Sequence, residues 1–154
     1  MYASFVSTHS FAESDATIRM DVAERLARIE DELAVFREGL SVRDEAPDSV
    51  RRATARIHEI LFDPSLAVTG IREDLGLTST TFPARFRRHH GCTPACYIRQ
   101  HRVEAAKSLL QYDDLPIADI AFHVGYEHYR TFARVFKRLT GRLPQAFREH
   151  CQSS

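Results

Sequence analysis

The chain repeats one pattern of about 30 residues, and this repeat strongly limits the folds open to it. Residues 68–97 align with residues 117–147, first with an offset of 49 and then, after one extra residue in the second copy, with an offset of 50. The aligned pairs are Val68 with Ile117, Ile71 with Ile120, Leu75 with Val124, Gly76 with Gly125, Leu77 with Tyr126, Phe86 with Phe136, Arg87 with Lys137, Arg88 with Arg138, Gly91 with Gly141 and Pro94 with Pro144. A match of this length predicts that one supersecondary unit occurs twice.

Each copy has the pattern of two helices separated by a glycine. In the second copy, apolar residues recur at steps of three and four from Ile117 to Val124, and Gly125 offers the positive φ that ends a helix. The next helix is predicted to begin near Glu127 and to end at Gly141. Its apolar face consists of Phe132, Val135, Phe136 and Leu139. This geometry is that of a helix-turn-helix unit, whose second helix enters the major groove of DNA.

One uninterrupted helix is predicted between the two copies, over residues 94–111. Its apolar residues follow a helical period, and neither glycine nor proline occurs after Pro94. A helix of this length spans about 26 Å, which suits a rigid spacer between recognition helices that enter major-groove faces ~34 Å apart. Residues 49–63 predict a further amphipathic helix that packs on the first copy.

Charge divides the chain into two parts. Residues 1–48 carry 5 Lys and Arg against 11 Asp and Glu, a net charge of −6, whereas residues 49–154 carry 16 against 10, a net charge of +6. A basic module is typical of nucleic-acid binding proteins, although ordinary solvated surfaces also reach this charge. We therefore expect an acidic N-terminal segment and a DNA-binding domain that begins at residue 49.

The arrangement closely resembles the DNA-binding domain of the AraC/XylS family of transcription regulators, over about residues 50–149. The matching residues are Ile120, Ala121, Val124, Gly125, Tyr126, Phe132, Arg134, Val135, Phe136, Lys137, Gly141, Pro144, Phe147 and Arg148. The resemblance implies an all-α fold of two helix-turn-helix subdomains, at about 66–91 and 116–141, joined by the linker helix. It also implies a sequence-specific transcription regulator that inserts two recognition helices into successive major grooves.

The resemblance further implies which residues of the second unit meet DNA. Arginine is well suited to bidentate contact with guanine, so Arg130 and Arg134 are expected to read bases. Lys137 and Arg138 are expected to hold phosphates. The full set of groove-facing residues is Tyr129, Arg130, Thr131, Ala133 and Arg134.

The first unit departs from the family pattern. Arg72 stands where the family usually has a small residue, and Pro83 falls inside the expected recognition helix, where a proline costs about 3 kcal/mol. The cost disappears if Thr80 caps the helix and Pro83 lies in its first turn. The base-facing residues are then Thr80, Pro83 and Ala84, which form few hydrogen bonds, while Arg85, Arg87 and Arg88 are expected to hold phosphates.

Six apolar residues of the acidic segment follow a heptad pattern. They are Val22, Leu26, Ile29, Leu33, Phe36 and Leu40. In a parallel coiled coil, Arg25 of one chain would face Glu30 of the other, and Glu32 and Arg37 would form a second pair of opposite charge. The pattern predicts a homodimer through residues 22–40. The same stripe would also suit a helix that packs on its own DNA-binding domain. Residues 1–17 show no period, and residues 43–49 have the composition of a linker.

Other functions find little support. His89, His90, Cys92 and Cys96 lie close in sequence, but a zinc site usually needs a second ligand pair, so we expect no metal. Without a phosphate-binding loop, a nucleophile elbow or an HExxH pair, we expect neither an enzyme nor a cofactor. His58 and His123 are expected to be structural or surface residues. The alternative function is a protein-interaction adaptor that keeps the fold with weak or lost DNA binding.

The sequence also predicts the surroundings of the protein. No apolar run approaches 18 residues, and the first residues lack the pattern of a secretion signal, which predicts a cytoplasmic protein that does not enter membranes. Three cysteines without a framework spacing are expected to be free thiols. The expected partners are double-stranded DNA, a second copy of the chain and RNA polymerase.

Overall fold

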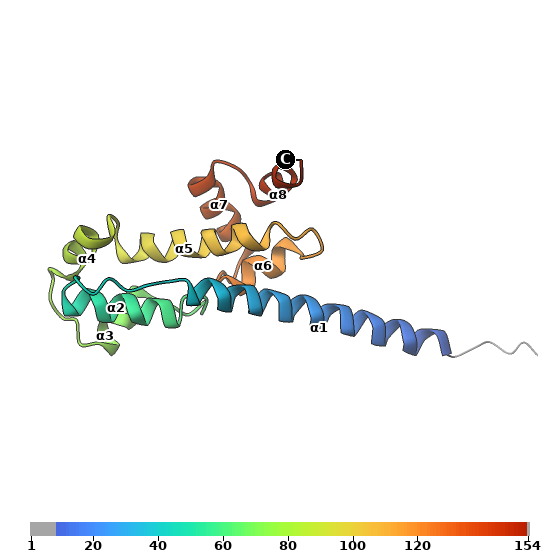
Figure 1. The fold of residues 1–154 in the computed structure, drawn as a ribbon, viewed down its shortest axis with the longest axis horizontal. Coiled ribbons are helices and arrows are strands. Elements are labelled where there is room, and N and C mark those ends of the chain that lie inside the picture. The colour runs from blue at the N-terminus through green and yellow to red at the C-terminus, as the bar shows by residue number, and fades with distance from the viewer. Residues whose placement is uncertain (1–8, 154) are drawn as a thin grey trace, which may run out of the picture.

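The computed structural model describes the backbone of residues 9–153 and the side chains of residues 21–153. Within this range every regular element is a helix, which confirms the predicted all-α fold (Figure 1). The helices are α1 His9–Glu38, α2 Asp48–Glu59, α3 Val68–Asp74, α4 Phe82–His90, α5 Pro94–Leu109, α6 Ile117–His123, α7 Tyr129–Thr140 and α8 Pro144–Gln152.

The two copies of the sequence repeat form the helix pairs α3–α4 and α6–α7, and α5 contacts both pairs (Figure 1). The predicted linker helix is present, although it ends at Leu109 rather than at residue 111. Both recognition helices, α4 and α7, stop at a glycine in the left-handed region, Gly91 with a φ of 77° and Gly141 with a φ of 79°. Glycine adopts this backbone without steric cost, so the repeat in sequence is also a repeat in conformation.

One further helix boundary and one whole helix differ from the sequence-based prediction. α7 begins at Tyr129 rather than near Glu127, because His128 has an extended backbone and takes the N-cap position. α8 was not predicted, since its nine residues carry few apolar side chains. Arg148 of α8 donates a hydrogen bond to the Leu115 carbonyl at 2.6 Å, which fixes α8 against the start of the second unit.

α4 begins late enough to accommodate Pro83. The helix starts at Phe82, so Pro83 lies in the first turn, where its missing N–H has no helical acceptor to lose. Thr81, and not Thr80 as predicted, takes the N-cap position, and its side chain makes no capping hydrogen bond. The hydroxyl of Ser79 accepts from the Thr81 N–H at 3.2 Å and shapes the turn before the helix.

Arg72 supports the turn of the first unit instead of packing inside it. Its guanidinium donates to the carbonyls of Leu77 at 3.2 Å and Ser79 at 3.4 Å. The aligned residue of the second unit is Ala121, which is buried in the core. The first unit therefore replaces a small apolar contact between its two helices by hydrogen bonds to the connecting turn.

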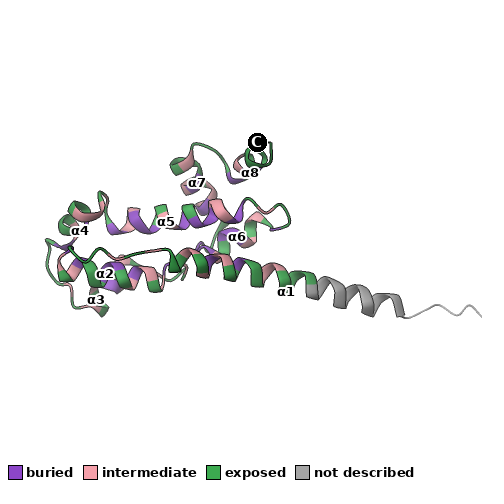
Figure 2. Ribbon diagram, viewed as in Figure 1, coloured by how far each residue is buried: buried purple, intermediate pink, exposed green. Residues whose placement is uncertain are grey.

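Each unit has its own apolar core, and the buried face of α5 contributes to both (Figure 2). Phe82 and Phe86 of α4 are buried in the first core, and Phe132 and Phe136 of α7 are buried in the second. Phe36 of α1 packs against both cores. Each recognition helix is thus anchored by its own pair of phenylalanines, at positions that are aligned in the repeat.

Arg102 of α5 joins the two units through a buried guanidinium. Its Nε and Nη2 donate to the carbonyls of Leu61 and Asp63 at 2.8 and 2.7 Å. Both acceptors follow α2, whereas Nη1 donates at 2.8 Å to Gly125 in the turn of the second unit. Burial lowers the pKa of Arg102, which is 7% exposed, and the three carbonyls compensate the buried charge. Gly125 has a φ of 97°, and a Cβ there would lie 2.6 Å from Arg102 Cζ, so this turn requires glycine.

The C-terminal half of α1 packs against the second unit of its own chain. Ile29 is completely buried and Leu33 is 7% exposed, and both belong to the second core. The hydroxyl of Tyr112 donates to Glu32 at 2.6 Å, which adds a polar contact between α1 and the segment before α6. α1 is therefore part of the folded domain.

The sequence leaves two partners open for the heptad stripe, a second copy of the chain or the chain's own DNA-binding domain. In this structure α1 packs on its own domain. Leu26 and Phe36 are half-buried, and Leu40 packs against the first core. Of the six heptad residues, Val22 alone is exposed, with 40% of its surface accessible. Ile29 and Leu33 cannot also pair with a second copy without leaving their own core, so the full seam is not open in this structure.

Candidate nucleic-acid interface

The outward face of α7 carries the predicted base-reading residues. Phe132 and Phe136 hold the opposite face in the core, so Arg130 and Arg134 point away from the domain. Tyr129 is 45% exposed at the start of the helix. The two smaller groove-facing residues, Thr131 and Ala133, are half-buried at the flanks.

Leu139 does not complete the apolar face of α7 as predicted. Val135 packs against the second core, but Leu139 is 41% exposed. Leu139 lines two surface hollows instead of making a buried contact. The buried face of α7 is therefore shorter than the sequence pattern indicates.

The cationic side chains of α7 are free of acidic partners. Arg130, Arg134, Lys137 and Arg138 are exposed, and in the described part of the chain none of these side chains forms an ion pair or a hydrogen bond. By contrast, the exposed Arg28 of α1 forms an ion pair with Asp114 at 2.8 Å. Four uncompensated charges on one helix produce a positive surface suited to phosphates and base edges.

α4 offers DNA a different surface at the aligned positions. Thr80 and Ala84 are exposed and Pro83 is half-buried, so the centre of the face carries a hydroxyl, a methyl group and a proline ring. An alanine methyl can contact the methyl group of thymine, but it cannot form the paired hydrogen bonds that identify guanine. The exposed cations of this helix are Arg85, Arg87 and Arg88.

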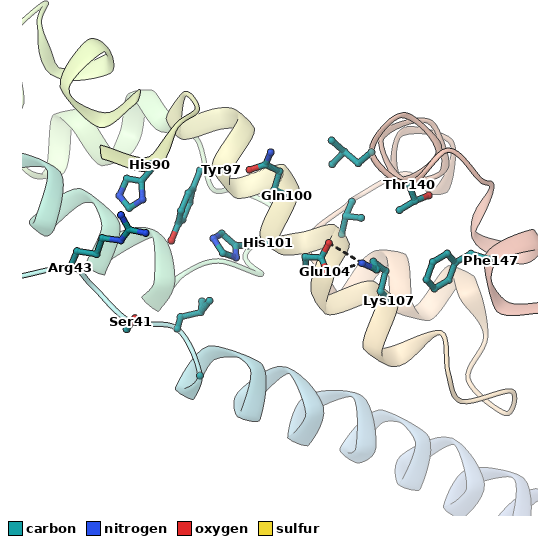
Figure 3. A pocket seen from close by; sticks show the side chains of 14 residues that line it. Ser41, Arg43, His90, Tyr97, Gln100, His101, Glu104, Lys107, Thr140 and Phe147 are labelled. Atoms are coloured by element: carbon teal, nitrogen blue, oxygen red, sulfur yellow. Dashed lines mark hydrogen bonds and ion pairs between the residues drawn. The ribbon is translucent and has the colours of Figure 1, made fainter. Parts of the chain in front are cut away.

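A large hollow lies beside α5 (Figure 3). Its volume is about 770 Å³, and it is lined by the α1–α2 connection, by α5, and by the ends of α4, α7 and α8. Arg43, His90 and Tyr97 lie at one end, and the ion pair of Lys107 with Glu104, 2.9 Å long, lies toward the other. Its lining does not include the predicted DNA contacts.

Three half-buried histidines surround Tyr97 beside this hollow. His58 Nε2 and the Tyr97 hydroxyl form a hydrogen bond of 2.8 Å. Burial lowers the pKa of His58 to about 4 and also lowers the pKa values of His90 and His101. The rings are therefore neutral at pH 7, and they fill space in the first unit without adding charge to the DNA-facing surface.

The histidine and cysteine stretch at 89–96 serves packing contacts. His90 Nε2 lies 2.9 Å from the Thr54 hydroxyl, and the Cys92 thiol donates to Gln100 at 3.5 Å. Among the residues that the structure describes, no group of three or more His, Cys, Asp or Glu side chains is placed to hold a metal ion. His123 Nδ1 bonds to the Asp119 carbonyl of its own helix.

Two residues near the interface were not predicted from the sequence. Arg102 is buried between the units, and Arg99 is exposed on α5 close to α7. Both lie outside the repeat pattern that identified the recognition helices. The one available signal for Arg102 is its place among the apolar residues of the predicted linker helix, between Ile98 and Val103.

Comparisons with known proteins match most of the two-unit region. A family model described as a helix-turn-helix domain covers residues 72–150. The arabinose operon regulatory protein of Escherichia coli (strain K12) is 29% identical over 112 residues, which are 73% of this chain and 38% of that protein. The Msm operon regulatory protein of Streptococcus mutans is 28% identical over 118 residues, 75% of this chain and 42% of that protein. The chain thus spans about two fifths of the length of these relatives.

A solved structure shares the fold. The C-terminal domain of AraT, a response regulator from Geobacillus stearothermophilus, superposes with a TM-score of 0.65 at 26% identity and covers 70% of this chain and 88% of that one. Two helix-turn-helix units on one linker helix define a class of DNA-binding regulators. The chain belongs to the AraC/XylS family of transcription regulators. The relatives named above are regulatory proteins and not enzymes.

None of the helices described in residues 9–153 is both long enough and apolar enough to cross a bilayer.

Proposed function

We propose that this chain binds specific DNA sequences through α7 and α4 and thereby regulates transcription. The observation that carries the proposal is the outward face of α7, where four exposed cationic side chains lack acidic partners in the described structure. Arg130 and Arg134 at its centre are the proposed base readers, and Lys137 and Arg138 at its flanks are the proposed phosphate contacts. The relatives' names support a regulatory role.

The two recognition helices have different tasks in this proposal. α7 supplies guanidinium groups for guanine, together with Tyr129, Thr131 and Ala133 at the edge of the groove. The first unit supplies Thr80, in the turn before α4, and Ala84 of α4, and the α4 cations Arg85, Arg87 and Arg88 hold the backbone. Specificity should therefore be concentrated in the half-site that α7 contacts.

Selection of bound fragments from a random duplex library tests this function. The full chain is the right material, because Ile29 and Leu33 of α1 belong to the second core. We expect one strongly conserved half-site beside one weakly conserved half-site. Log affinity for the selected duplex should fall linearly with log salt, because bound phosphates release counterions. An affinity that does not change with salt, or no enrichment at all, would contradict the proposal.

The adaptor alternative is decided by the same selection. An adaptor would fold normally and enrich no duplex, since its cationic surface would serve a protein partner. The uncompensated charge on α7 favours DNA, because phosphates lie along every duplex at a regular spacing that several exposed arginines can follow.

Three further partner and location predictions belong to this proposal. We propose a cytoplasmic location and a contact with RNA polymerase, as a transcription regulator needs. The homodimer through residues 22–40 stays a prediction, and the burial of Ile29 and Leu33 in their own chain counts against it. Sedimentation of the full chain at tens of micromolar decides this point.

A further inference from the structure

A second hollow lies between α5 and the outward part of α7. Its volume is about 450 Å³. Its lining combines arginines with apolar residues and includes no acidic side chain among the described residues. The lining residues are Cys96 and Arg99 of α5 and Arg134, Val135, Arg138 and Leu139 of α7.

The three arginines of this hollow are not neutralised by the protein. Arg99, Arg134 and Arg138 are exposed, and in the part of the chain that the structure describes none of their side chains forms an ion pair or a hydrogen bond. Like charges that line one concave surface repel each other, and the concave shape strengthens their common field. An anion in the hollow would remove this repulsion and accept several hydrogen bonds at once.

The position of the hollow indicates which anion it meets. α4 packs at one end of α5 and α7 packs across it, so Arg99 stands on the linker between the recognition helices (Figure 1). Arg134 lies on the outward face of α7 and also lines the hollow, so the hollow opens on the surface that carries the proposed base readers. When two recognition helices enter successive major grooves on one face of a duplex, the backbone strands that separate those grooves run between the two helices.

We propose that this hollow binds a phosphodiester of the DNA backbone between the two major grooves, with Arg99 as a DNA contact outside both recognition helices. Arg99 and Arg138 approach the phosphate from α5 and α7, and the planar guanidinium suits bidentate contact with its oxygens. Arg134 remains directed at the neighbouring base edge. This inference rests on the proposed function, because it names a further contact of the same interface.

The first test compares two single arginine substitutions in the full chain. Arg99→Ala should weaken binding to the selected duplex about tenfold at low salt and reduce the slope of log affinity against log salt by about 1. Arg43→Ala removes another exposed arginine, which lines the other hollow, and it should leave both quantities unchanged. Arg99→Lys should keep the slope but recover part of the affinity, since lysine has the charge without the planar donors. Circular dichroism confirms that each variant is folded.

The second test identifies the phosphate. Single methylphosphonate substitutions remove one charge at a time along the backbone between the two half-sites. Substitution at one phosphate, or at two adjacent phosphates, should weaken binding by the wild-type chain. The same substitution should reduce the affinity of the Arg99→Ala variant only slightly, because that variant has already lost the contact. If every methylphosphonate reduced the affinity of wild type and of Arg99→Ala by the same factor, the inference would be overturned, because no phosphate would then be held by Arg99.

The third test distinguishes backbone phosphate from free anion. Alkylation of the Cys96 thiol, read by mass spectrometry against the exposed Cys151, reports access to the hollow. Duplex DNA should protect Cys96 from alkylation, and inorganic phosphate at millimolar concentration should not. If inorganic phosphate protected Cys96 from alkylation as well as duplex DNA does, the hollow would be a site for a free anion, and the proposed phosphodiester would be wrong.

The failures of the two proposals are distinguishable. If the wild-type chain binds no duplex, the proposed function fails and this contact fails with it. If the chain binds the selected duplex and Arg99→Ala behaves like Arg43→Ala, the function stands and the contact at Arg99 is wrong.

Discussion

The two helix-turn-helix units share a backbone plan but present different chemistry to DNA. Arg134 stands where the first unit has Ala84, and Arg130 stands where it has Thr80. The cations at the flanks are kept in both units, as Arg87 and Arg88 in one and Lys137 and Arg138 in the other. Under the proposed function, the first unit would hold the backbone without forming the hydrogen bonds that identify bases, so the difference teaches that the two tasks are separable.

The units also differ in what supports them. The first core contains α2 and lies beside the histidine cluster around Tyr97, whereas the second core contains Ile29 and Leu33 of α1. Substitution of Ile29 or Leu33 should therefore destabilise the second unit, whereas acidification should destabilise the first.

The largest effect is expected from Leu33→Glu. A carboxylate buried in the second core without a partner costs several kcal/mol, so we expect loss of folding of the second unit and of DNA binding. Leu40→Glu is the matched control, because Leu40 is half-buried at the edge of the first core. Urea denaturation followed by circular dichroism measures both. A folded Leu33→Glu monomer obtained from a wild-type dimer would contradict this packing.

Exchanging the aligned residues Pro83 and Ala133 should give the next effect. Ala133→Pro places a proline inside α7 and should destabilise the domain by about 3 kcal/mol. Pro83→Ala should change stability by less than about 1 kcal/mol, because the first turn of α4 needs no N–H donor there. Equilibrium unfolding decides the matter, and a large stabilisation by Pro83→Ala would show that Pro83 strains α4.

A smaller effect, confined to binding, is expected from Arg134→Ala. It should cost about 1–3 kcal/mol on the selected duplex and relax preference at particular base pairs. Thr80→Ala, just before α4 at the position aligned with Arg130, should cost less and leave preference nearly intact. Competition binding against duplexes with single base-pair changes measures both. Full sequence preference in Arg134→Ala would mean that α7 does not read bases through this residue.

Mild acid should weaken the first unit. The pKa of His58 is lowered from 6.5 to about 4 in the folded chain, mainly by burial and also by His101 and His90. The unfolded chain therefore binds more protons between these values, so stability should fall as pH drops from about 6.5 toward 4. His58→Gln should flatten this dependence in urea titrations taken across the pH range. A pH dependence unchanged in His58→Gln would place the titrating group elsewhere.

Much of the fold could be predicted from the sequence, because local signals and packing agree within the repeat. Apolar residues at helical spacing before Gly125 and Gly141 define helices whatever surrounds them. The partner of α1 could not be predicted, since a stripe such as Ile29 and Leu33 suits a second chain and a neighbouring helix equally well. Arg102 escaped prediction because arginine on a helix is usually solvated, and its three carbonyl acceptors come from distant parts of the chain.

The buried guanidinium of Arg102 also has a consequence for the DNA. Its hydrogen bonds hold Leu61 and Gly125 to α5, and they thereby fix the spacing between the two recognition helices. Under the proposed function, each base pair added between half-sites would turn the second groove by about 34° away from the helix that enters it. The flexibility needed to fit two grooves to one rigid body then falls to the duplex. Easily kinked TA or CA steps between the half-sites would be favoured there, although no side chain touches their bases.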